Sequence, residues 1–334
     1  MKNVLITGAS GFVGSFLVAE AVAQGYQVLA GIRKTSSTKH LQQAGVHLVE
    51  LNFADTALLT QQLQQAETNF GTIDYVVHNA GLTQANNPND FFTVNAQYTR
   101  HFVAALQQLG HPLQKFVLIS SLAAYGPGKA DFQPITIHTP YAPITAYGRS
   151  KLEAELFVKN IVDWPYVIIN PTAVYGPRDK DLFEFVKLVH GGFEPYLGRH
   201  QQMITLIHVH DLARATIAVM GRADVVRNSY IVSDGNSYSK EELGAVLKGL
   251  FGKKTFKIKL PLAPIVAVVS LVEKLYALAG KRPFLNKEKV TEISSANWIC
   301  ESEIWDALQT KPTYVLSNGM QQTVAWYTAN GWLK

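Results

Sequence analysis

The sequence predicts an α/β protein with a doubly wound parallel sheet and a smaller, mostly helical C-terminal lobe. Two observations point to this architecture. Short apolar runs alternate with helical patterns through the first half of the chain, and parallel strands require crossover helices of that kind. After position 170 the alternation loosens into segments punctuated by Gly and Pro before helical periodicity resumes. We therefore expect one large domain and a second, smaller one.

The strands of the first half are predicted from short apolar runs, at residues 3–7, 27–32, 47–51, 75–78, 116–121 and 166–170. Helical periodicity fills the intervals between them, at residues 12–24, 56–66, 89–109 and 144–161. Two later apolar segments, 204–209 and 229–232, are expected to be strands that either return to the main sheet or brace the second lobe. The predicted domains are residues 1–175, rejoined by about 200–235, and a discontinuous lobe at 176–334.

Composition excludes several classes of protein. The 334 residues are 47% apolar and 16% charged, which suffices for a full core. A single cysteine, Cys300, excludes a disulfide framework and a multi-cysteine metal site, so we expect no metal. The net charge of +5 is dispersed, which argues against nucleic acid as a partner. The N-terminus has no pattern of a secretory signal, and we expect a cytoplasmic protein.

The segment after the first predicted strand is a glycine-rich turn that opens the first predicted helix. Three glycines in that context allow a tight turn, a close approach of the backbone to a pyrophosphate and close packing of helix on strand. The N-terminus of the helix then offers unpaired N–H groups to the anion. We therefore expect a dinucleotide to bind at Thr7, Gly8, Ser10, Gly11, Phe12, Val13 and Gly14.

The residues after the second predicted strand indicate which dinucleotide binds. Enzymes that use NAD place a carboxylate about 20 positions after the glycine turn, where it receives the ribose hydroxyls and would repel a 2'-phosphate. This chain has Arg33 and Lys34 there, and a guanidinium can hold a phosphate through two parallel hydrogen bonds. We therefore expect a preference for NADP(H), with NAD(H) as the alternative.

Tyr147 and Lys151 lie four residues apart in a predicted helix, so both side chains share one face. A cation favours the ionised form of a nearby phenol, which makes Tyr147 a usable proton donor or acceptor near neutral pH. Ser121 ends the predicted strand at 116–121, and ligands bind at the carboxyl ends of parallel strands. We expect Ser121, Tyr147 and Lys151 to be the catalytic residues.

These residues and several further motifs resemble the extended short-chain dehydrogenase/reductase family, also called the NAD-dependent epimerase/dehydratase family. The resemblance covers nearly the whole chain. It runs in family order through TGASGFVG at 7–14, HNAG at 78–81, Asn95, Ser120-Ser121 before Tyr125-Gly126, the Tyr147 and Lys151 pair, PTAVYGP at 171–177 and VHDLA at 209–213. Dihydroflavonol reductase-like and 3-beta-hydroxysteroid dehydrogenase-like members are the most similar in style.

The resemblance implies a Rossmann-type fold whose C-terminal lobe binds the substrate. It makes Tyr147 the acid and base, Ser121 the hydroxyl that orients a carbonyl, and Lys151 a ligand of the nicotinamide ribose. It also implies cofactor contacts from Asn52, Phe53, Asn79, Ala80, Gly81, Asn95, Tyr147, Lys151, Pro171, Thr172 and Ala173, the last three beside the nicotinamide ring.

Four positions in or near these motifs need separate interpretation. The family usually has Asp-Leu where this chain has Asn52-Phe53, which weakens the expected adenine contact. Asp55 in the same turn is expected to cap the following helix. Asn95 either orients a group in the site or makes a local packing contact. His208 and His210 share a strand face, but no further ligand is evident and we expect them to be structural.

The leading functional interpretation is reversible hydride transfer between NADPH and a carbonyl or alcohol of a largely apolar small molecule. One alternative is a nucleotide-sugar epimerase or dehydratase that uses the same site, and another is a non-catalytic NADP(H)-binding protein on the same fold. Family members that act on nucleotide sugars usually place an Arg for the diphosphate where this chain has Ile204, although Arg199 lies nearby.

The apolar segment at about 260–280 admits three interpretations. Leu271, Leu275 and Leu278 follow the apolar residues 260–266 at helical spacing, as in a core helix, a substrate lid or a face that contacts a membrane. Glu273 and Lys274 end the run short of the about 20 residues that span a bilayer, so we expect no transmembrane helix. Ordinary core is the favoured interpretation. Peripheral membrane contact and a homodimer are left open.

Overall fold

The computed structural model of the chain describes residues 1–162, 164–198, 201–278 and 286–333. The chain forms two compact units. Unit 1 contains Met1–Ala124, Ala146–Asn170 and Ala213–Tyr230, and unit 2 contains Tyr125–Thr145, Pro171–Leu212 and Ile231–Lys334. The segment at 125–145 therefore groups with the later part of the chain, which the sequence did not indicate, and the segment that rejoins unit 1 is 213–230.

A seven-stranded sheet of order β10-β6-β5-β4-β1-β2-β3 forms the centre of unit 1. Neighbouring strands from β3 through β6 pair in parallel. The order reverses beside β1, where β2 and β4 lie on either side, as in a doubly wound Rossmann-type sheet. The strands are β1 (Asn3–Thr7), β2 (Gln27–Ile32), β3 (Val46–Glu50), β4 (Tyr75–His78), β5 (Lys115–Ile119), β6 (Tyr166–Pro171) and β10 (Asn228–Val232).

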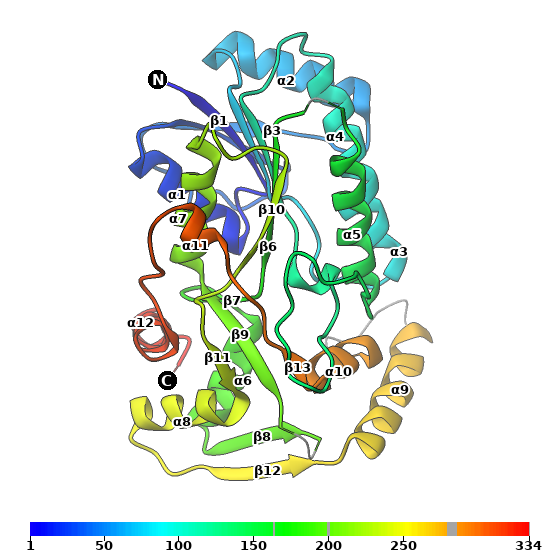
Figure 1. Cartoon of the computed structure of the whole chain (residues 1–334), viewed down its shortest axis with the longest axis vertical. Helices are drawn as coiled ribbons and strands as arrows, with labels where there is room; N and C mark the ends of the chain where they lie inside the picture. Colours follow the sequence, from blue (N-terminus) through cyan, green and yellow to red (C-terminus); the bar gives the residue numbers. More distant parts are fainter. Residues whose placement is uncertain (163, 199–200, 279–285, 334) are drawn as a thin grey trace. The chain divides into compact units, whose positions relative to one another are not determined.

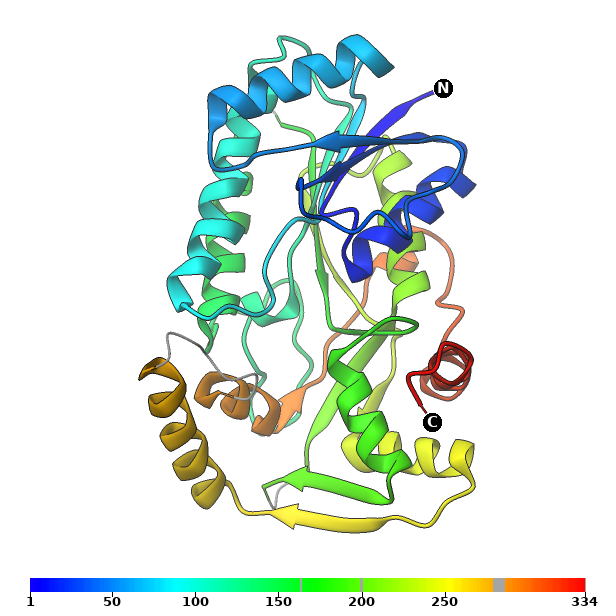
Figure 2. The same ribbon diagram turned by 180° about the vertical axis from the view of Figure 1, so that it is seen from behind.

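Helices cover both faces of this sheet. Figures 1 and 2 show α1 (Phe12–Ala23) and α7 (Val209–Gly221) on one face, and α2 (Thr56–Phe70), α4 (Tyr98–Gln107) and α5 (Ala146–Lys159) on the other. The second group buries its apolar stripe against the sheet, and the aliphatic and aromatic residues of that interface form one continuous core. Asp55 caps α2 by accepting from the backbone N–H of Leu58 at 3.0 Å, as predicted.

The predicted helix at 89–109 is interrupted. It consists of α3 (Pro88–Phe91), a π-helical segment η1 (Phe92–Gln97) and α4. The interruption surrounds Asn95, whose buried amide bonds to Leu82 and to Ser150 instead of facing solvent. The π-helical segment is only six residues long, too short for a change of period to be recognised in the sequence, and π-helical turns often occur at functional sites.

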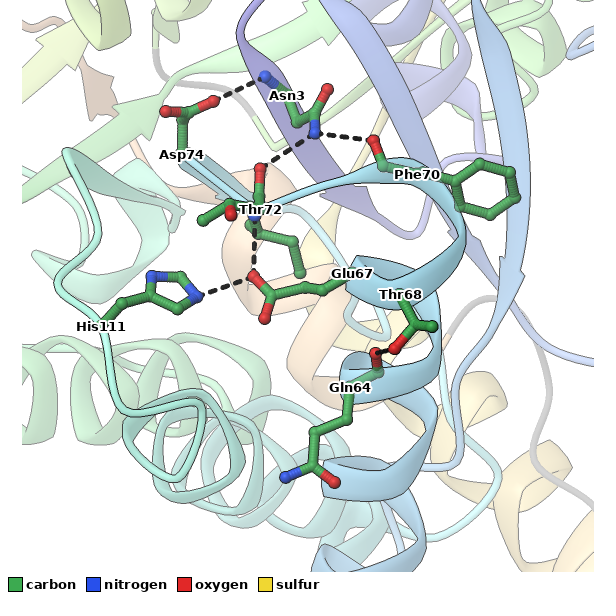
Figure 3. Close-up of polar contacts among 9 residues, drawn as sticks. Asn3, Gln64, Glu67, Thr68, Phe70, Thr72, Asp74 and His111 are labelled. Atoms are coloured by element: carbon green, nitrogen blue, oxygen red, sulfur yellow. Dashed lines mark hydrogen bonds and ion pairs between the residues drawn. The ribbon is translucent and has the colours of Figure 1, made fainter.

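A polar network lies at the end of the sheet where β1 begins (Figure 3). The Asn3 amide donates to the carbonyls of Phe70 and Thr72 at 3.0 and 2.9 Å, and the Asn3 N–H donates to Asp74 at 2.9 Å. Nearby, Glu67 accepts from the Ile73 N–H and pairs with a histidine side chain. The loop from α2 to β4 is thereby fixed at the end of β1 opposite the glycine turn.

Unit 2 contains two small sheets and six helices of its own among the described residues. One sheet joins β11 (Ser237–Ser239), β9 (Met203–His208), β13 (Asn297–Trp298) and β7 (Ala173–Tyr175), and the other pairs β8 (Phe193–Leu197) with β12 (Phe256–Leu260). The helices are α6 (Asp181–His190), α8 (Lys240–Phe251), α9 (Leu262–Leu278), α10 (Lys287–Ser294), α11 (Ile304–Ala307) and α12 (Leu316–Ala329).

The two late strands expected from the sequence belong to different sheets. The segment at 229–232 is in β10 and returns to the main sheet, whereas the segment at 204–209 is in β9 and braces the small sheet of unit 2. Asp211 accepts from the N–H groups of Thr313 and Tyr314 at 2.9 and 2.7 Å, so this motif residue joins α7 to the segment before α12. In the described parts of the chain no helix is long and apolar enough to cross a bilayer.

Candidate cofactor and catalytic site

The glycine turn between β1 and α1 leaves room for a phosphate. Gly8 has φ of 63°, and a Cβ there would lie 2.9 Å from the Ala80 backbone. A Cβ on Gly14 would lie 2.0 Å from the carbonyl oxygen of Gly8, which no side chain can tolerate. Gly11 is the N-cap of α1, and no side chain caps that helix end. The open N-terminus and the bare backbone of the turn fit the pyrophosphate of a dinucleotide.

Thr7, the last residue of β1, links the glycine turn to the loop after β4. Its hydroxyl oxygen accepts from the N–H groups of Asn79 and Ala80, both at 3.1 Å, and bonds to His78 Nδ1 at 2.8 Å. His78 Nε2 bonds to Thr99 Oγ1 at 3.0 Å, and that hydroxyl donates to the carbonyl of Asn95 at 2.7 Å. Two expected cofactor ligands, Asn79 and Ala80, are thus held beside the turn.

This chain of bonds sets the protonation state of His78. Because the Thr99 hydroxyl gives its proton to a carbonyl, it accepts from Nε2–H, and Nδ1 then accepts from Thr7. Burial, together with the smaller effect of the Lys151 charge, lowers the pKa of His78 to about 3. The imidazole is therefore neutral at physiological pH and acts as a fixed connector.

Lys151 is a buried ammonium group at the carboxyl end of β5. Its Nζ donates to the carbonyl of Ile119 at 2.9 Å, and only 7% of the residue is exposed. Burial lowers the pKa of Lys151 to about 8, and the carboxylate of Glu155 opposes that shift. A Cβ on Gly81 would lie 2.9 Å from the Asn95 amide oxygen and 3.2 Å from Lys151 Nζ, so the loop passes close over the lysine.

Ser121 and Tyr147 lie on the elements that frame this lysine. Ser121 follows the end of β5, and its hydroxyl oxygen accepts from the N–H of Ala123 at 3.1 Å. Tyr147 is in the first turn of α5, partly exposed, with its ring in edge contact with Phe91 at 5.9 Å between centroids. One helical turn separates it from Lys151. The predicted catalytic residues therefore come from α5 and from the segment that follows β5.

The sequence interpretation missed Glu155. This carboxylate is fully buried on α5, where it accepts from the hydroxyl of Ser120 and, at 2.5 Å, from the amide of Asn170. The same amide lies 3.2 Å from the carbonyl of Ser121. Glu155 therefore connects the ends of β5 and β6 beside the residues that the sequence predicts to be catalytic. Its signal in the sequence is the spacing of Tyr147, Lys151 and Glu155 on one helical face.

Arg33 and Lys34 follow β2 directly and are exposed to solvent. Asn52 and Phe53, the expected cofactor contacts after β3, have more contacts within the protein. The N–H of Asn52 donates to Gln62 at 2.8 Å, and its side-chain oxygen accepts from Ala54 at 3.1 Å. Phe53 packs edge-on against a phenylalanine of α4. The backbone N–H of Asn52 is thus bonded to a side chain of α2, and its side-chain oxygen is bonded within the turn.

Pro171, Thr172 and Ala173 belong to unit 2. The Thr172 hydroxyl donates to the carbonyl of Thr205 at 2.7 Å, and Ala173 begins β7 with its side chain exposed. Ile204 is half-buried in β9, and Arg199 lies outside the described residues.

The histidine pair of unit 2 is packed among aromatic rings. His208 is fully buried and lies 4.1 Å from Tyr314 and 5.5 Å from His210 between ring centroids. Burial lowers the pKa of His208 to about 3, so the ring is neutral. Within the described residues no three His, Cys, Asp or Glu side chains gather as a metal site would require. The packing gives His208 a structural role.

Similarity to known proteins agrees with this geometry. Residues 4–233 match the sequence model of the NAD dependent epimerase/dehydratase family. The chain is 27% identical to a ceramide reductase of Caulobacter vibrioides, over 99% of this chain and 96% of the relative. It is 26% identical to a UDP-glucose 4-epimerase of Vibrio cholerae, over 98% and 97% of the two chains.

A solved structure has the same fold and contains a dinucleotide. It is the UDP-glucuronic acid 4-epimerase of Bacillus cereus in complex with NAD, which superposes with a TM-score of 0.74 at 21% identity and covers 98% of this chain and 99% of its own. The family match extends over the glycine turn, the loop after β4, and the helix that carries Tyr147 and Lys151. This chain therefore belongs to the NAD-dependent epimerase/dehydratase family, the extended short-chain dehydrogenase/reductases.

Proposed function

We propose that this protein is an NADP(H)-dependent oxidoreductase that interconverts a carbonyl group and a secondary or primary alcohol on a largely apolar small molecule. The observation that carries the proposal is the buried Lys151 ammonium, which is held on the Ile119 carbonyl one helical turn from Tyr147. A fixed positive charge beside a phenol favours proton transfer by that phenol. The presence of Ser121 and Tyr147 together with this cation favours an enzyme over a protein that only binds a dinucleotide.

The glycine turn supports a dinucleotide cofactor because side chains are excluded where a pyrophosphate would lie. When bound, the nicotinamide supplies or accepts a hydride. Arg33 and Lys34 support NADP(H), since both cations are exposed directly after β2, where an NAD enzyme would carry a carboxylate. The two side chains are therefore available to bind a 2'-phosphate.

In the reducing direction, residues of the chain bind the carbonyl oxygen of the substrate and protonate it. Ser121 donates a hydrogen bond to that oxygen and orients it, and Tyr147 gives it a proton as the alcohol forms. Lys151 stabilises the phenolate that remains. Near pH 7 a lysine whose pKa is about 8 is mostly charged, so this stabilisation is present under physiological conditions. Glu155 keeps the ends of β5 and β6 in place.

Two features support an apolar substrate. Ile204 stands in β9, where the nucleotide-sugar members of the family usually have an arginine for the diphosphate. A relative of full length is named for the reduction of ceramide, which is a lipid. Loss of the arginine removes a charge-assisted contact, which weakens binding of a diphosphate and does not affect an apolar ligand.

Nucleotide-sugar epimerisation is the second candidate, because another relative of nearly full length is named UDP-glucose 4-epimerase. The two functions differ in an observable way. An oxidoreductase consumes NADPH in proportion to the ketone or aldehyde reduced, whereas an epimerase regenerates its cofactor and shows no net consumption. Purified protein should be incubated with NADPH and a panel of long-chain ketones and aldehydes, and in parallel with UDP-, GDP- and dTDP-sugars. Binding of a nucleotide sugar at micromolar concentration, with no ketone reduced, would overturn the proposal.

The chemical roles are tested with Tyr147→Phe, which removes the transferable proton and leaves the ring in contact with Phe91. Turnover should fall by about 10² to 10⁴ while NADPH binding is kept. Tyr98→Phe is the matched control, because Tyr98 is a partly exposed tyrosine on α4 of the same unit. Wild-type turnover in Tyr147→Phe on the true substrate would show that the mechanism is wrong.

The cofactor preference is tested with Arg33→Ala. Affinity for NADPH should fall by about ten-fold or more, as expected for loss of a bidentate phosphate contact, and affinity for NADH should change little. Arg100→Ala is the control, since Arg100 is an exposed arginine of unit 1 that pairs with Glu153 at 2.8 Å. Equal losses for both cofactors would rule out a role of Arg33 in recognising the 2'-phosphate.

A further inference from the structure

Helix α9 exposes a continuous apolar face. Val268, Leu271, Leu275 and Leu278 are 61%, 60%, 57% and 87% exposed, and their spacing places all four on one side of the helix. Val269, on the other side, is 6% exposed. The favoured sequence interpretation of this segment as ordinary core is therefore wrong, because its leucines point away from unit 2.

The adjoining strands extend this face. β12 runs directly into α9, and Phe256 of β12 pairs in register with Phe193 of β8. The two rings are 69% and 53% exposed. In both views α9 lies beside α10, and among the described elements of unit 2 none covers its other side. We call β8, β12 and α9 together the apolar surface. Isolated exposed apolar residues are normal, but a contiguous group marks an interaction site.

The apolar surface is also basic. In β12 and α9 the chain has three lysines, Lys257, Lys259 and Lys274, and a single carboxylate, Glu273; Lys253 and Lys254 lie just before β12. Lys257 and Lys259 alternate with the apolar residues of β12, with side chains 48% and 58% exposed. Their nearest carboxylates, on Glu194 and Glu241, are 3.9 and 4.0 Å away. At these distances the pairs contribute little, and both lysine side chains are exposed enough to meet another anion.

We propose that the apolar surface binds peripherally to membranes that contain anionic lipids. The leucines and phenylalanines enter the boundary between headgroups and acyl chains, and the lysines contact the lipid phosphates. This proposal goes beyond the proposed function, because it concerns where the protein binds. It does not depend on the identity of the substrate. An apolar substrate dissolved in the bilayer would, however, be within reach of an enzyme attached in this way.

The dimensions of α9 require it to lie in the plane of the interface. Its 17 residues extend about 25 Å at 1.5 Å per residue, short of the about 30 Å of a hydrocarbon core. Glu273 and Lys274 also lie within the helix, near its C-terminal end. An interfacial helix with one apolar face and flanking lysines is the form expected for peripheral attachment.

Charge distinguishes a membrane from a second copy of the chain. In a two-fold symmetric dimer the apolar surface would meet a copy of itself, so two basic surfaces would be brought together. Like charges brought together at a contact that excludes water are unfavourable. A membrane with anionic lipids presents negatively charged headgroups next to an apolar layer of acyl chains. It can therefore contact both the lysines and the apolar side chains of the surface.

The test is flotation of the full-length protein with vesicles of phosphatidylcholine alone and of phosphatidylcholine mixed with phosphatidylglycerol. The wild type should float with the anionic vesicles, and added salt should weaken this binding. The double variant Leu271→Glu/Leu275→Glu should reduce partitioning by about ten-fold or more, since two exposed leucines that would enter the bilayer are replaced by charges. Lys257→Glu/Lys259→Glu should remove the preference for anionic lipid.

Leu188→Glu is the matched control and should float like the wild type, because Leu188 is a 46% exposed leucine on α6, in the same unit. Thermal unfolding of every variant, followed by circular dichroism, checks that the fold is intact, because all these substitutions lie in unit 2. The proposal would be overturned if the wild type bound neither kind of vesicle. It would also be overturned by a wild-type dimer in light scattering that Leu271→Glu/Leu275→Glu dissociates, since the surface would then cover a second copy.

Discussion

Replacing Glu155 by alanine should destabilise unit 1 severely. The carboxylate is fully buried and accepts from the Ser120 hydroxyl and, at 2.5 Å, from the Asn170 amide. Removing it leaves both buried donors without this acceptor, at about 1–3 kcal/mol each. The free energy of unfolding should therefore fall by about 2–6 kcal/mol, a large part of the about 5–15 kcal/mol typical of folded proteins. Chemical denaturation followed by circular dichroism measures this loss.

Glu153→Ala is the control for this experiment, because Glu153 is on the same helix and contributes only an exposed pair with Arg100 at 2.8 Å. Its loss should be below about 1 kcal/mol. Since the chain has two units, hydrogen exchange should be measured across α5 and β5 as well, where the Glu155→Ala effect should be concentrated. If Glu155→Ala were no less stable than Glu153→Ala, the buried carboxylate would not hold the two strand ends together.

Glu155→Gln separates the charge of this residue from its shape. Burial lowers the pKa of Lys151 to about 8 and the Glu155 carboxylate raises it, so the amide should lower that pKa further. NADPH binding, measured as a function of pH, should then weaken at a lower pH than in the wild type, because the ammonium loses its proton earlier. Glu153→Gln should leave the profile unchanged. An unshifted profile in Glu155→Gln would show that its charge does not act on Lys151.

Three further predictions follow from the geometry. Gly14→Ala should abolish NADPH binding in a fluorescence titration, because its Cβ would lie 2.0 Å from a carbonyl oxygen of the turn, whereas Gly249→Ala meets no atom within 4 Å and should bind normally. His78, with a folded pKa of about 3 against 6.5 when unfolded, stabilises the fold fully above pH 6.5, and this contribution should decline by up to about 1.4 kcal/mol per pH unit as pH falls toward 3. Urea titrations of His78→Gln should lack that decline, and an identical slope would contradict the neutral imidazole. Asp211→Ala should speed hydrogen exchange at residues 313–314, whose N–H groups lose their acceptor, and unchanged exchange there would refute this link.

Sequence patterns were most reliable where the structure is local. The strands of the first half begin and end within one or two residues of their predicted positions, because their apolar runs are short and bounded by turns. The helix predicted at 89–109 was wrong in its interior, because the π-helical turn is held by Asn95 bonding to Leu82 and Ser150. Those partners lie 13 and 55 residues away along the chain, and no local pattern records them.

The short strands of unit 2 show the same limit. β7, β11 and β13 have two or three residues each, too few for a periodicity. They exist because β9 offers hydrogen-bonding partners to each of them. The sequence did not reveal the role of Glu155 for a related reason. An acidic residue on a helix is usually solvated, and only the arrangement of β5, β6 and α5 makes this one a buried acceptor.

The sequence by itself determined the fold class, the family, the glycine turn and the spacing of Tyr147 and Lys151. Each of these depends on residues adjacent in the chain or one helical turn apart, where backbone geometry alone relates sequence to position. The tertiary structure decided the protonation state of His78, the burial of Lys151 and Glu155, and the exposure of the leucines on α9. Those properties depend on which distant segments remove water from a side chain and which leave it exposed, and only the packed chain determines that.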